Sequence, residues 1–280
     1  SRIIKKNNIK RSCSKSHVQG SMNLIDTHSH LYAEEFDENR DSLIQEAIES
    51  GIERILLPNI DSTSIDRMFS LCDAYPGFVL PMMGLHPTSV DCNYEKELEQ
   101  IQSLLEIREY CAIGEIGIDL YWDKTYLKEQ EIVFEEQLRW AVKMNLPVAI
   151  HTREAFPEVL QCIHNVGNDK LSGVFHSFTG NEKELDAVLE LNNFKIGING
   201  VVTYKNSTLR EILKKTSIDK IVLETDAPYL PPVPYRGKTN LPIYIWKTAE
   251  KIAEIFGLSV KETVEITRNN TLELFKIVNK

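Results

Sequence analysis

The sequence lacks the signatures of several large classes of protein. It has no run of the roughly 18 apolar residues that a membrane-spanning helix needs, so nothing in it predicts a membrane partner. It also has neither the G-x-G-x-x-G fingerprint of dinucleotide-binding folds nor a complete phosphate-binding P-loop. Nucleotide-binding folds that cradle phosphates in such loops are therefore disfavoured.

Cysteine is scarce and scattered. The chain has 5 cysteines among 280 residues, and none of them stands in a C-x-x-C pair. An odd number at wide spacing supports neither a disulfide framework nor a cysteine zinc site. We interpret these residues as reduced thiols and expect a cytoplasmic protein.

Acidic residues are missing from residues 1–22, which carry six basic side chains. The rest of the chain holds 26 basic against 41 acidic residues, a net charge of −15. A basic, acid-free head is typical of a nucleic-acid arm or a transit peptide. Because Met22 directly precedes the first strand pattern, we favour a disordered extension or an expression-vector remnant. Residues 23–280 then form a single domain, whose acidity argues against nucleic-acid binding through a broad basic surface.

The chain does contain short β-branched apolar runs that alternate with longer amphipathic segments. This alternation is typical of βα units around a parallel sheet, and eight such units closed into a barrel take about 250 residues. We therefore predict an α/β fold, a (β/α)8 TIM barrel. The segments Leu241–Phe256 and Val260–Val278 add one helix more than eight units require. The predicted strands are Leu24–His30, Glu53–Ile60, Phe78–His86, Ala112–Asp119, Pro147–His151, Gly173–Ser177, Phe194–Gly200 and Ile221–Asp226.

Chemically active side chains recur where the predicted strands end. In (β/α)8 barrels, this edge and the loops that follow it form the active site. Five of the seven histidines fall there, together with several carboxylates. The strand-end segments are Asp26-Thr-His28-Ser-His30, Gly84-Leu-His86-Pro87, Gly114-Glu115-Ile-Gly117-Ile-Asp119, His151-Thr-Arg153, His176-Ser-Phe-Thr-Gly180 and Glu224-Thr-Asp226-Ala-Pro228.

His28 and His30 are the first candidate metal ligands. Because they stand two residues apart on a strand, their side chains face the same way and both imidazoles can reach one cation. Alone, this pair is weak support, since alternating polar residues occur on many strands. His151 and His176 stand at the ends of two further strands, which makes chance placement a poor explanation.

Glu115 and Asp226 complete the candidate set. Glu115 has apolar neighbours and no lysine nearby in sequence, which favours a metal over a buried ion pair. Asp226 could instead cap a helix before Pro228, but in a barrel the last strand brings it toward the His28 pair. Four histidines and two carboxylates suffice for two divalent cations, an arrangement suited to activating water for hydrolysis. Such ligands suit Zn, Mn or Co and tolerate Mg, so the identity of the metal stays open.

Three further strand-end residues each keep more than one interpretation. His86 and Asp119 could bind substrate, orient a metal ligand or merely satisfy a loop. Arg153 shares the face of His151, and its guanidinium could form bidentate hydrogen bonds to a phosphate or a surface ion pair.

In their order along the chain, these motifs resemble the TatD family of metal-dependent deoxyribonucleases, within the amidohydrolase-like barrels. The resemblance spans most of Leu24–Phe275 and adds the loop segment Tyr235-Arg236-Gly237-Lys238. It implies a two-metal phosphodiesterase, a 3′-5′ exodeoxyribonuclease that acts on DNA through a metal-activated water. The family commonly continues that loop with an asparagine, an acid and a proline, whereas this chain reads Asn240-Leu241-Pro242, which alters the expected loop contacts but not the metal ligands.

The resemblance also implies individual roles. One metal would be held by residues of the first, fourth and eighth strands, namely His28, His30, Glu115 and Asp226. The second would be held by residues of the fourth, fifth and sixth strands, namely Glu115, His151 and His176. The residues implied near the substrate are His86, Arg153, Tyr235 and Arg236. Glu115, which bridges the metals, and Asp226, which accepts a proton from the nucleophilic water, are the predicted catalytic residues.

Two rival functions stay open at this point. A metal hydrolase on the same barrel could act on a small phosphoester, lactone or amide, because an activated water serves all of these reactions. Arg153, Arg236 and Lys238 favour a phosphate among them. The other rival is a non-catalytic nucleic-acid-binding protein, against which the complete ligand set argues. We expect a monomer that acts on DNA at a 3′ end or on a single strand, using two divalent cations (Mg, Mn or Zn).

Overall fold

Eight parallel strands form the centre of the protein. The computed structural model describes residues 22–277, so the extension predicted over residues 1–22 lies outside the described residues except for Met22. The strands are β1 Leu24–Asp26, β2 Ile52–Leu57, β3 Val79–Pro81, β4 Ile113–Asp119, β5 Val148–Arg153, β6 Gly173–Phe175, β7 Phe194–Ile198 and β8 Ile221–Leu223. Each lies within its predicted range, except that β2 starts one residue earlier and β5 ends two residues later.

The strands close into a barrel through two irregular joins. Regular parallel pairing runs β1-β2-β3 on one side and β4-β5-β6-β7-β8 on the other. A bridge between Met83 and Ile113 joins the two sets after β3. At the other join, the Thr27 amide donates to the Leu223 carbonyl at 3.0 Å, and the Asp226 amide donates to the His28 carbonyl at 2.8 Å. The barrel prediction is confirmed, and its closure places the end of β8 beside the end of β1.

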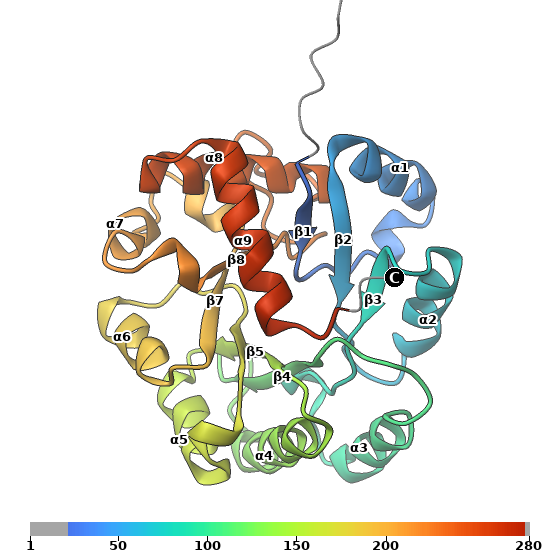
Figure 1. The fold of residues 1–280 in the computed structure, drawn as a ribbon. Helices are drawn as coiled ribbons and strands as arrows, with labels where there is room; N and C mark the ends of the chain where they lie inside the picture. Colours follow the sequence, from blue (N-terminus) through green and yellow to red (C-terminus); the bar gives the residue numbers. More distant parts are fainter. Residues whose placement is uncertain (1–21, 278–280) are drawn as a thin grey trace, which may run out of the picture.

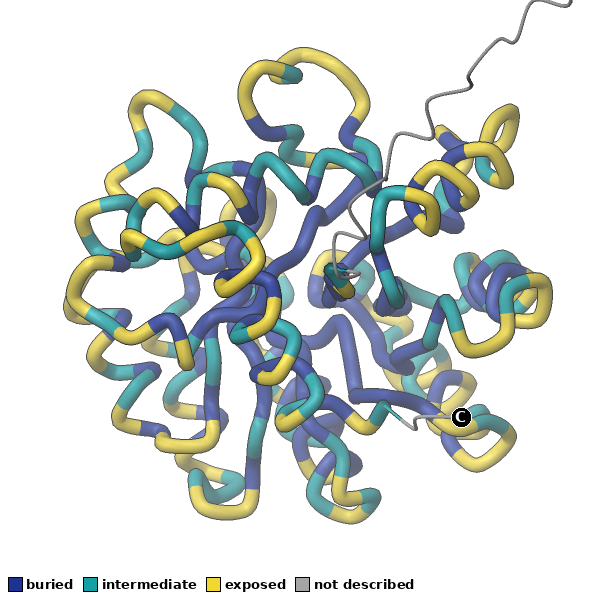
Figure 2. Tube along the Cα trace, turned by 45° about the horizontal axis from the view of Figure 1, so that its top comes forward, coloured by how far each residue is buried: buried dark blue, intermediate teal, exposed yellow. Residues whose placement is uncertain are grey.

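Helices surround the barrel, and their outward faces carry the exposed residues (Figures 1 and 2). The α-helices are α1 Arg40–Ser50, α2 Ile65–Ala74, α3 Tyr94–Ser103, α4 Leu127–Met144, α5 Phe156–Val166, α6 Glu182–Glu190, α7 Leu209–Leu213, α8 Ile245–Phe256 and α9 Val260–Leu274. The short 3-10 turns are η1 Glu34–Phe36, η2 Pro87–Ser89, η3 Asn168–Lys170, η4 Gly200–Thr203, η5 Ile218–Lys220 and η6 Pro242–Tyr244. Within residues 22–277, no helix has the length and apolar character needed to cross a bilayer.

Apolar side chains form two separate clusters. The larger one fills the space between the strands and the surrounding helices and includes Phe134, Phe175 and Phe194. The smaller takes one residue from or beside each of seven strands, and therefore lies inside the barrel, namely Ile25, Leu56, Met82, Ala112, Ala149, Val174 and Val222. Each fully buried aliphatic or aromatic side chain stabilises the fold by about 1.5–3 kcal/mol.

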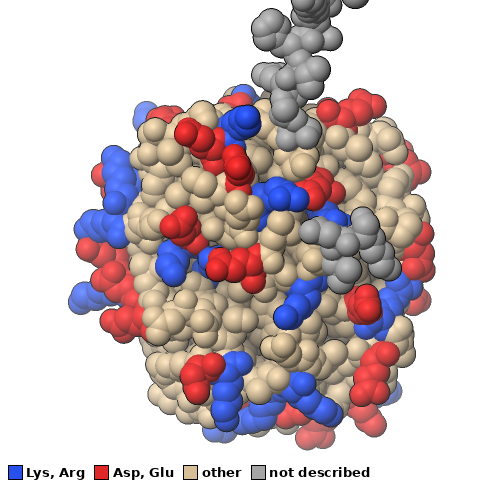
Figure 3. All heavy atoms as spheres, in the orientation of Figure 1, with Lys and Arg blue, Asp and Glu red and all other residues tan. Residues whose placement is uncertain are grey.

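The additional helix α9 covers the barrel mouth at the N-terminal ends of the strands (Figure 1). Just after it, Phe275 packs into the cluster inside the barrel, and the Lys276 amide donates to the Cys111 carbonyl at 3.2 Å. Lys195 of β7 pairs with Glu273 of α9 at 3.3 Å. On this face, acidic and basic side chains are interspersed (Figure 3). Packing by α9 and Phe275 thus closes the barrel interior at its N-terminal end, and the C-terminal ends of the strands are left for chemistry.

Candidate metal centre

The carboxylate of Glu115 lies at the middle of the C-terminal end of the barrel. Its side chain projects from β4 and is only 2% exposed. The oxygen Oε2 lies 3.1 Å from His28 Nε2 and 3.6 Å from His30 Nε2. Asp226 Oδ1 completes this side, 3.6 Å from His28 Nε2 and 3.3 Å from His30 Nε2. Glu115 Oε2 and Asp226 Oδ1 therefore face the same two imidazoles.

The other oxygen, Oε1, faces a different set of imidazoles. It lies 3.1 Å from His151 Nδ1, 3.4 Å from His86 Nε2 and 3.5 Å from His176 Nε2. His151 comes from β5, and His176 follows β6 directly. His86, which the sequence analysis left open between several roles, is thus buried inside the cluster rather than on its rim.

Two of these histidines are held by carboxylates on their outer side. His151 Nε2 lies 2.7 Å from Asp119 Oδ2, and His176 Nδ1 lies 2.9 Å from Glu224 Oε1. Such outer partners fix which ring nitrogen faces the centre. Glu224 is fully buried, and a side chain on Gly197 of β7 would come within 2.3 Å of its carboxylate, so glycine there leaves room for Glu224. Sequence reasoning quoted Glu224 within a motif and missed this role, although its spacing of two from Asp226 is a signal for it.

Tyr32 holds His30 in a similar way. Its hydroxyl lies 3.0 Å from His30 Nδ1 and donates to the Pro58 carbonyl at 2.5 Å. With the hydroxyl hydrogen committed to Pro58, the oxygen is free to accept a hydrogen bond from His30 Nδ1, which leaves Nε2 as the free base facing Asp226. Tyr32 was also missed, although it continues the spacing of two set by His28 and His30.

Asp226 takes a backbone conformation that few residues adopt. Its φ is +57°, in the left-handed region that disfavours side chains with a Cβ. The hydrogen bond from its amide to the His28 carbonyl holds it there. The next helical element after Asp226 is η6, so Asp226 does not cap a helix and its carboxylate is free to face the centre. Strain of this kind is concentrated at functional sites.

Buried Asp26 connects the segments that follow β1 and β8. It accepts hydrogen bonds from the Thr225 hydroxyl at 2.6 Å, the Thr225 amide at 3.0 Å and the His28 amide at 3.2 Å. Burial raises the pKa of Asp26 to about 7, even though the bonds from Thr225 work in the opposite direction. Asp26 therefore positions both strand ends without facing the centre itself.

The electrostatics of the centre depend on the balance between burial and neighbouring charge. Burial opposes ionisation of Glu115, but the nearby imidazoles of His28, His86 and His176 outweigh it and hold the pKa of Glu115 well below its usual range. Burial likewise opposes protonation of His176, yet Glu224, Asp226 and Glu115 together raise its pKa to about 10. The cluster thus needs positive charge to compensate buried carboxylates.

The donor set fits divalent metal ions. Among residues 22–277, three groups bring ligand atoms within 4.8 Å of one another: His28 with Glu115 and His176, His28 with His30 and Asp226, and His86 with Glu115 and His151. Imidazole nitrogen and carboxylate oxygen suit Zn, Mn and Co. A buried carboxylate whose two oxygens face two sets of imidazoles has the form of a bridge between two cations.

The other three residues predicted near the substrate, Arg153, Tyr235 and Arg236, are not among these groups of ligand atoms, and each contacts an aromatic ring. Arg153 is exposed, and its guanidinium lies 3.7 Å from the centre of the Tyr121 ring. Tyr235 stacks on Tyr244, with ring centres 3.8 Å apart. Arg236 lies over the ring of Tyr204 at 4.0 Å. Their substrate roles stay predictions.

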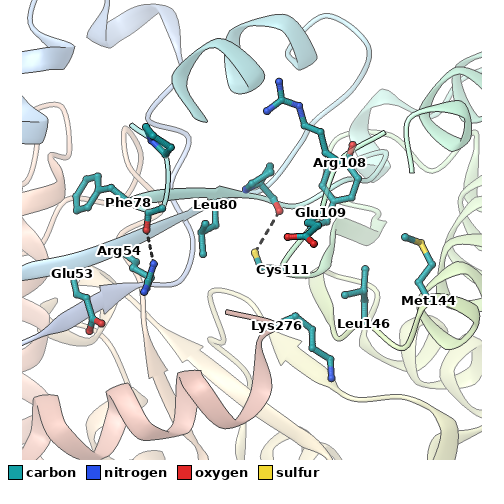
Figure 4. A pocket seen from close by; sticks show the side chains of 14 residues that line it. Glu53, Arg54, Phe78, Leu80, Arg108, Glu109, Cys111, Met144, Leu146 and Lys276 are labelled. Atoms are coloured by element: carbon teal, nitrogen blue, oxygen red, sulfur yellow. Dashed lines mark hydrogen bonds between the residues drawn. The ribbon is translucent and has the colours of Figure 1, made fainter. Parts of the chain in front are cut away.

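A cavity of about 910 Å³ lies at the opposite end of the molecule (Figure 4). It opens where β2 to β5 begin and is lined by residues such as Arg54, Leu80, Cys111, Leu146 and Lys276. None of the clustered histidines lines it. A smaller pocket of about 310 Å³, lined in part by His176 and Arg153, lies on the C-terminal face. The converging ligand atoms, rather than cavity volume, mark the candidate centre.

Fold and site together define a class of protein: a metal-dependent hydrolase on a (β/α)8 barrel. The model of the family described as TatD related DNase matches residues 25–276. The chain belongs to this family.

Individual relatives agree with this assignment. The chain is 35% identical to the uncharacterized metal-dependent hydrolase YabD of Bacillus subtilis, a match that covers 91% of this chain and 99% of the relative. It is 30% identical to the 3′-5′ ssDNA/RNA exonuclease TatD of Pectobacterium parmentieri, covering 91% of this chain and 100% of that protein. Among solved structures, it resembles the TatD homologue YjjV of Escherichia coli, with a TM-score of 0.84, 29% identity, and coverage of 91% and 98%.

Proposed function

We propose that this protein is a two-metal phosphodiesterase that removes nucleotides from the 3′ end of single-stranded DNA. The observation that carries the proposal is the position of Glu115, whose oxygens face His28 and His30 on one side and His151 and His176 on the other. The name of the Pectobacterium relative, a 3′-5′ ssDNA/RNA exonuclease, supports the substrate class.

The proposed ligands are the two sets that the resemblance to the family implies. One cation would be held by His28, His30, Glu115 and Asp226. The other would be held by Glu115, His151 and His176, with His86 beside them. Mg, Mn and Zn are the candidate ions. All of these groups come from one chain, so a monomer suffices for the reaction.

When bound, the two cations would lower the pKa of a water molecule and offset the charge of the scissile phosphate. The proton transfer is carried out by a side chain of the protein. Neighbouring His176, His28 and His30 outweigh burial and lower the pKa of Asp226, so its carboxylate is ionised near neutral pH and can accept a proton from the attacking water.

Positive charge at the rim offsets repulsion between a polyanion and this acidic protein. Arg153 follows His151 by two residues at the end of β5, where its guanidinium can approach a phosphate oxygen as negative charge grows in the transition state. His86, buried beside Glu115, would contact the substrate or steady the bridging carboxylate.

The test is degradation of end-labelled single- and double-stranded DNA, with an RNA strand in parallel, in Mg, in Mn or in a chelator. Asp226→Asn is the control, since it keeps the shape of the side chain and removes the base. Shortening from the 3′ end that needs both metal and Asp226 is the expected result. Absence of cleavage by metal-loaded protein would contradict the nuclease activity and favour a small phosphoester, lactone or amide as the substrate.

A further inference from the structure

Three side chains form an exposed group beside the metal centre. Tyr121 and Trp122, in the loop after β4, are 48% and 73% exposed. Their rings meet edge to face with centres 4.8 Å apart. The Arg153 guanidinium lies 3.7 Å from the centre of the Tyr121 ring and 5.5 Å from that of Trp122. Aromatic rings leave so much surface in water at a cost, which a ligand would relieve.

This group is connected directly to the candidate metal ligands. The Tyr121 amide donates to Asp119 Oδ1 at 3.0 Å, while Asp119 Oδ2 lies 2.7 Å from His151 Nε2. Arg153 follows His151 by two residues and pairs in register with Asp119 across β4 and β5. The group is therefore held at a fixed place on the rim of the centre.

The exposed aromatic rings gather at the same end of the barrel as the metal centre. Among the large apolar side chains exposed within residues 22–277, the aromatic ones are Tyr121, Trp122 and Tyr229. All three stand in loops that follow strands at the C-terminal end. Tyr229 lies edge-on to His30, with ring centres 5.8 Å apart. Exposed Ile107, by contrast, belongs to the segment that leads into β4 at the opposite end.

We propose that Tyr121, Trp122 and Arg153 form a stacking platform for one unpaired base of the strand whose 3′ end enters the metal centre. The inference rests on the proposed function and specifies its substrate contact. Every base has a π-face, so stacking on an indole or a guanidinium tolerates any sequence, as an exonuclease requires. Inside a duplex, both faces of a base are covered by the neighbouring pairs, so the platform favours single strands.

The test measures binding of the metal-loaded protein to a short fluorescent single strand whose phosphorothioate linkages resist cleavage. Trp122→Ala should weaken binding roughly 5- to 100-fold, while Trp122→Phe, which keeps a ring, stays within about threefold of the parent. Ile107→Ala, an exposed apolar residue at the other end, should change nothing. Thermal unfolding of each variant checks that the fold is kept.

A second series identifies the stacked base. Strands with an abasic site at successive positions from the 3′ end should show one position where losing the base weakens binding as much as Trp122→Ala does. At that position, the Trp122→Ala protein should lose nothing further. Equal binding by parent and Trp122→Ala, or the same loss at every position in both proteins, overturns the platform.

The cleavage assay separates this inference from the proposed function. If the Trp122→Ala protein binds and degrades single strands as the parent does, the platform is wrong and the nuclease stands. If position-dependent binding is found but no strand is cleaved, the platform stands and the proposed reaction is wrong. If no strand binds at all, both are wrong.

Discussion

The two ends of the barrel use ionisable groups in opposite ways. At the C-terminal end, Glu115 is only 2% exposed and has five imidazoles within 3.6 Å. At the N-terminal end, Phe275 closes the barrel interior, and charged side chains such as Arg268 and Glu53 pair near the surface. The largest cavity described above lies at that second end, yet its lining brings together no group of metal ligands.

This contrast separates stability from chemistry. Burying a carboxylate or an imidazole costs free energy unless a partner or a metal compensates it. Such groups are buried together at the C-terminal end, whereas at the N-terminal end apolar packing and partly buried ion pairs hold the fold. Substitutions at the C-terminal end should therefore change metal binding and turnover, and those at the N-terminal end should change only the stability of the fold.

The largest effect is expected from Glu115→Gln. An amide keeps the shape but removes the charge that faces both sets of histidines, so metal content and turnover should fall together. The loss should exceed the roughly 10- to 100-fold that follows from changing an outer partner of a ligand. Elemental analysis and the cleavage assay measure it, with exposed Glu109→Gln at the N-terminal end as the matched control. Full metal content in Glu115→Gln contradicts the bridge.

A smaller effect is expected from the carboxylates that orient the histidines. Asp119→Asn and Glu224→Gln leave all proposed ligands in place but weaken the hold on His151 and His176. Metal affinity or kcat/KM should fall about 10- to 100-fold in each. Asp123→Asn, an exposed aspartate in the same loop as the platform, is the control. A loss no larger than that of the control would show that the two histidines need no outer partner.

Much of this site could be predicted from local sequence pattern. The spacing of two predicted that His28 and His30 serve one cation, and both do approach Glu115 and Asp226, although they lie beyond the end of β1. The alternation of strands with helices predicted the barrel, and therefore the edge at which Glu115 and Asp226 lie. The barrel edge follows from chain geometry that holds for any such barrel, whereas the loop after β1 that carries His28 and His30 is held by contacts with the end of β8.

The remainder depends on tertiary contacts that no spacing encodes. That Glu224 lies against His176 requires the absence of a side chain on Gly197 of the neighbouring strand. Arg153 was predicted from its position after His151, but its stacking on Tyr121 arises from the path of the β4 loop. The predicted strands also ran past the observed ends at β1, β3 and β8, because they were extended to the residues expected to face the site, and in the structure those residues lie in the loops that follow the strands.

At the N-terminal end, Glu53→Gln should destabilise the fold without affecting catalysis. Glu53 accepts two hydrogen bonds from Arg268, at 2.6 and 3.0 Å, which attach α9 to β2. Removing the carboxylate charge from this partly buried pair should lower the free energy of unfolding by about 1–3 kcal/mol. Urea unfolding measures the loss, while kcat/KM of the folded enzyme should match the parent. A reduced kcat/KM would contradict the expectation that substitutions at the N-terminal end change only stability.

The smallest effect is expected from Asp73, which pairs with Arg108 on the surface at 2.8 and 3.0 Å. The hydrogen bond from Arg108 lowers the pKa of Asp73 below its ordinary value of 3.8. Because the folded state favours the ionised form more than the unfolded chain does, the pair stabilises the fold above about pH 4, and this contribution is lost as pH falls through the lowered pKa. Asp73→Asn should therefore unfold at slightly lower urea than the parent near neutral pH, and the gap should close in acid and in high salt. A gap that widens in acid would show that ionised Asp73 does not stabilise the fold. A change in cleavage rate would show that the N-terminal end also affects catalysis.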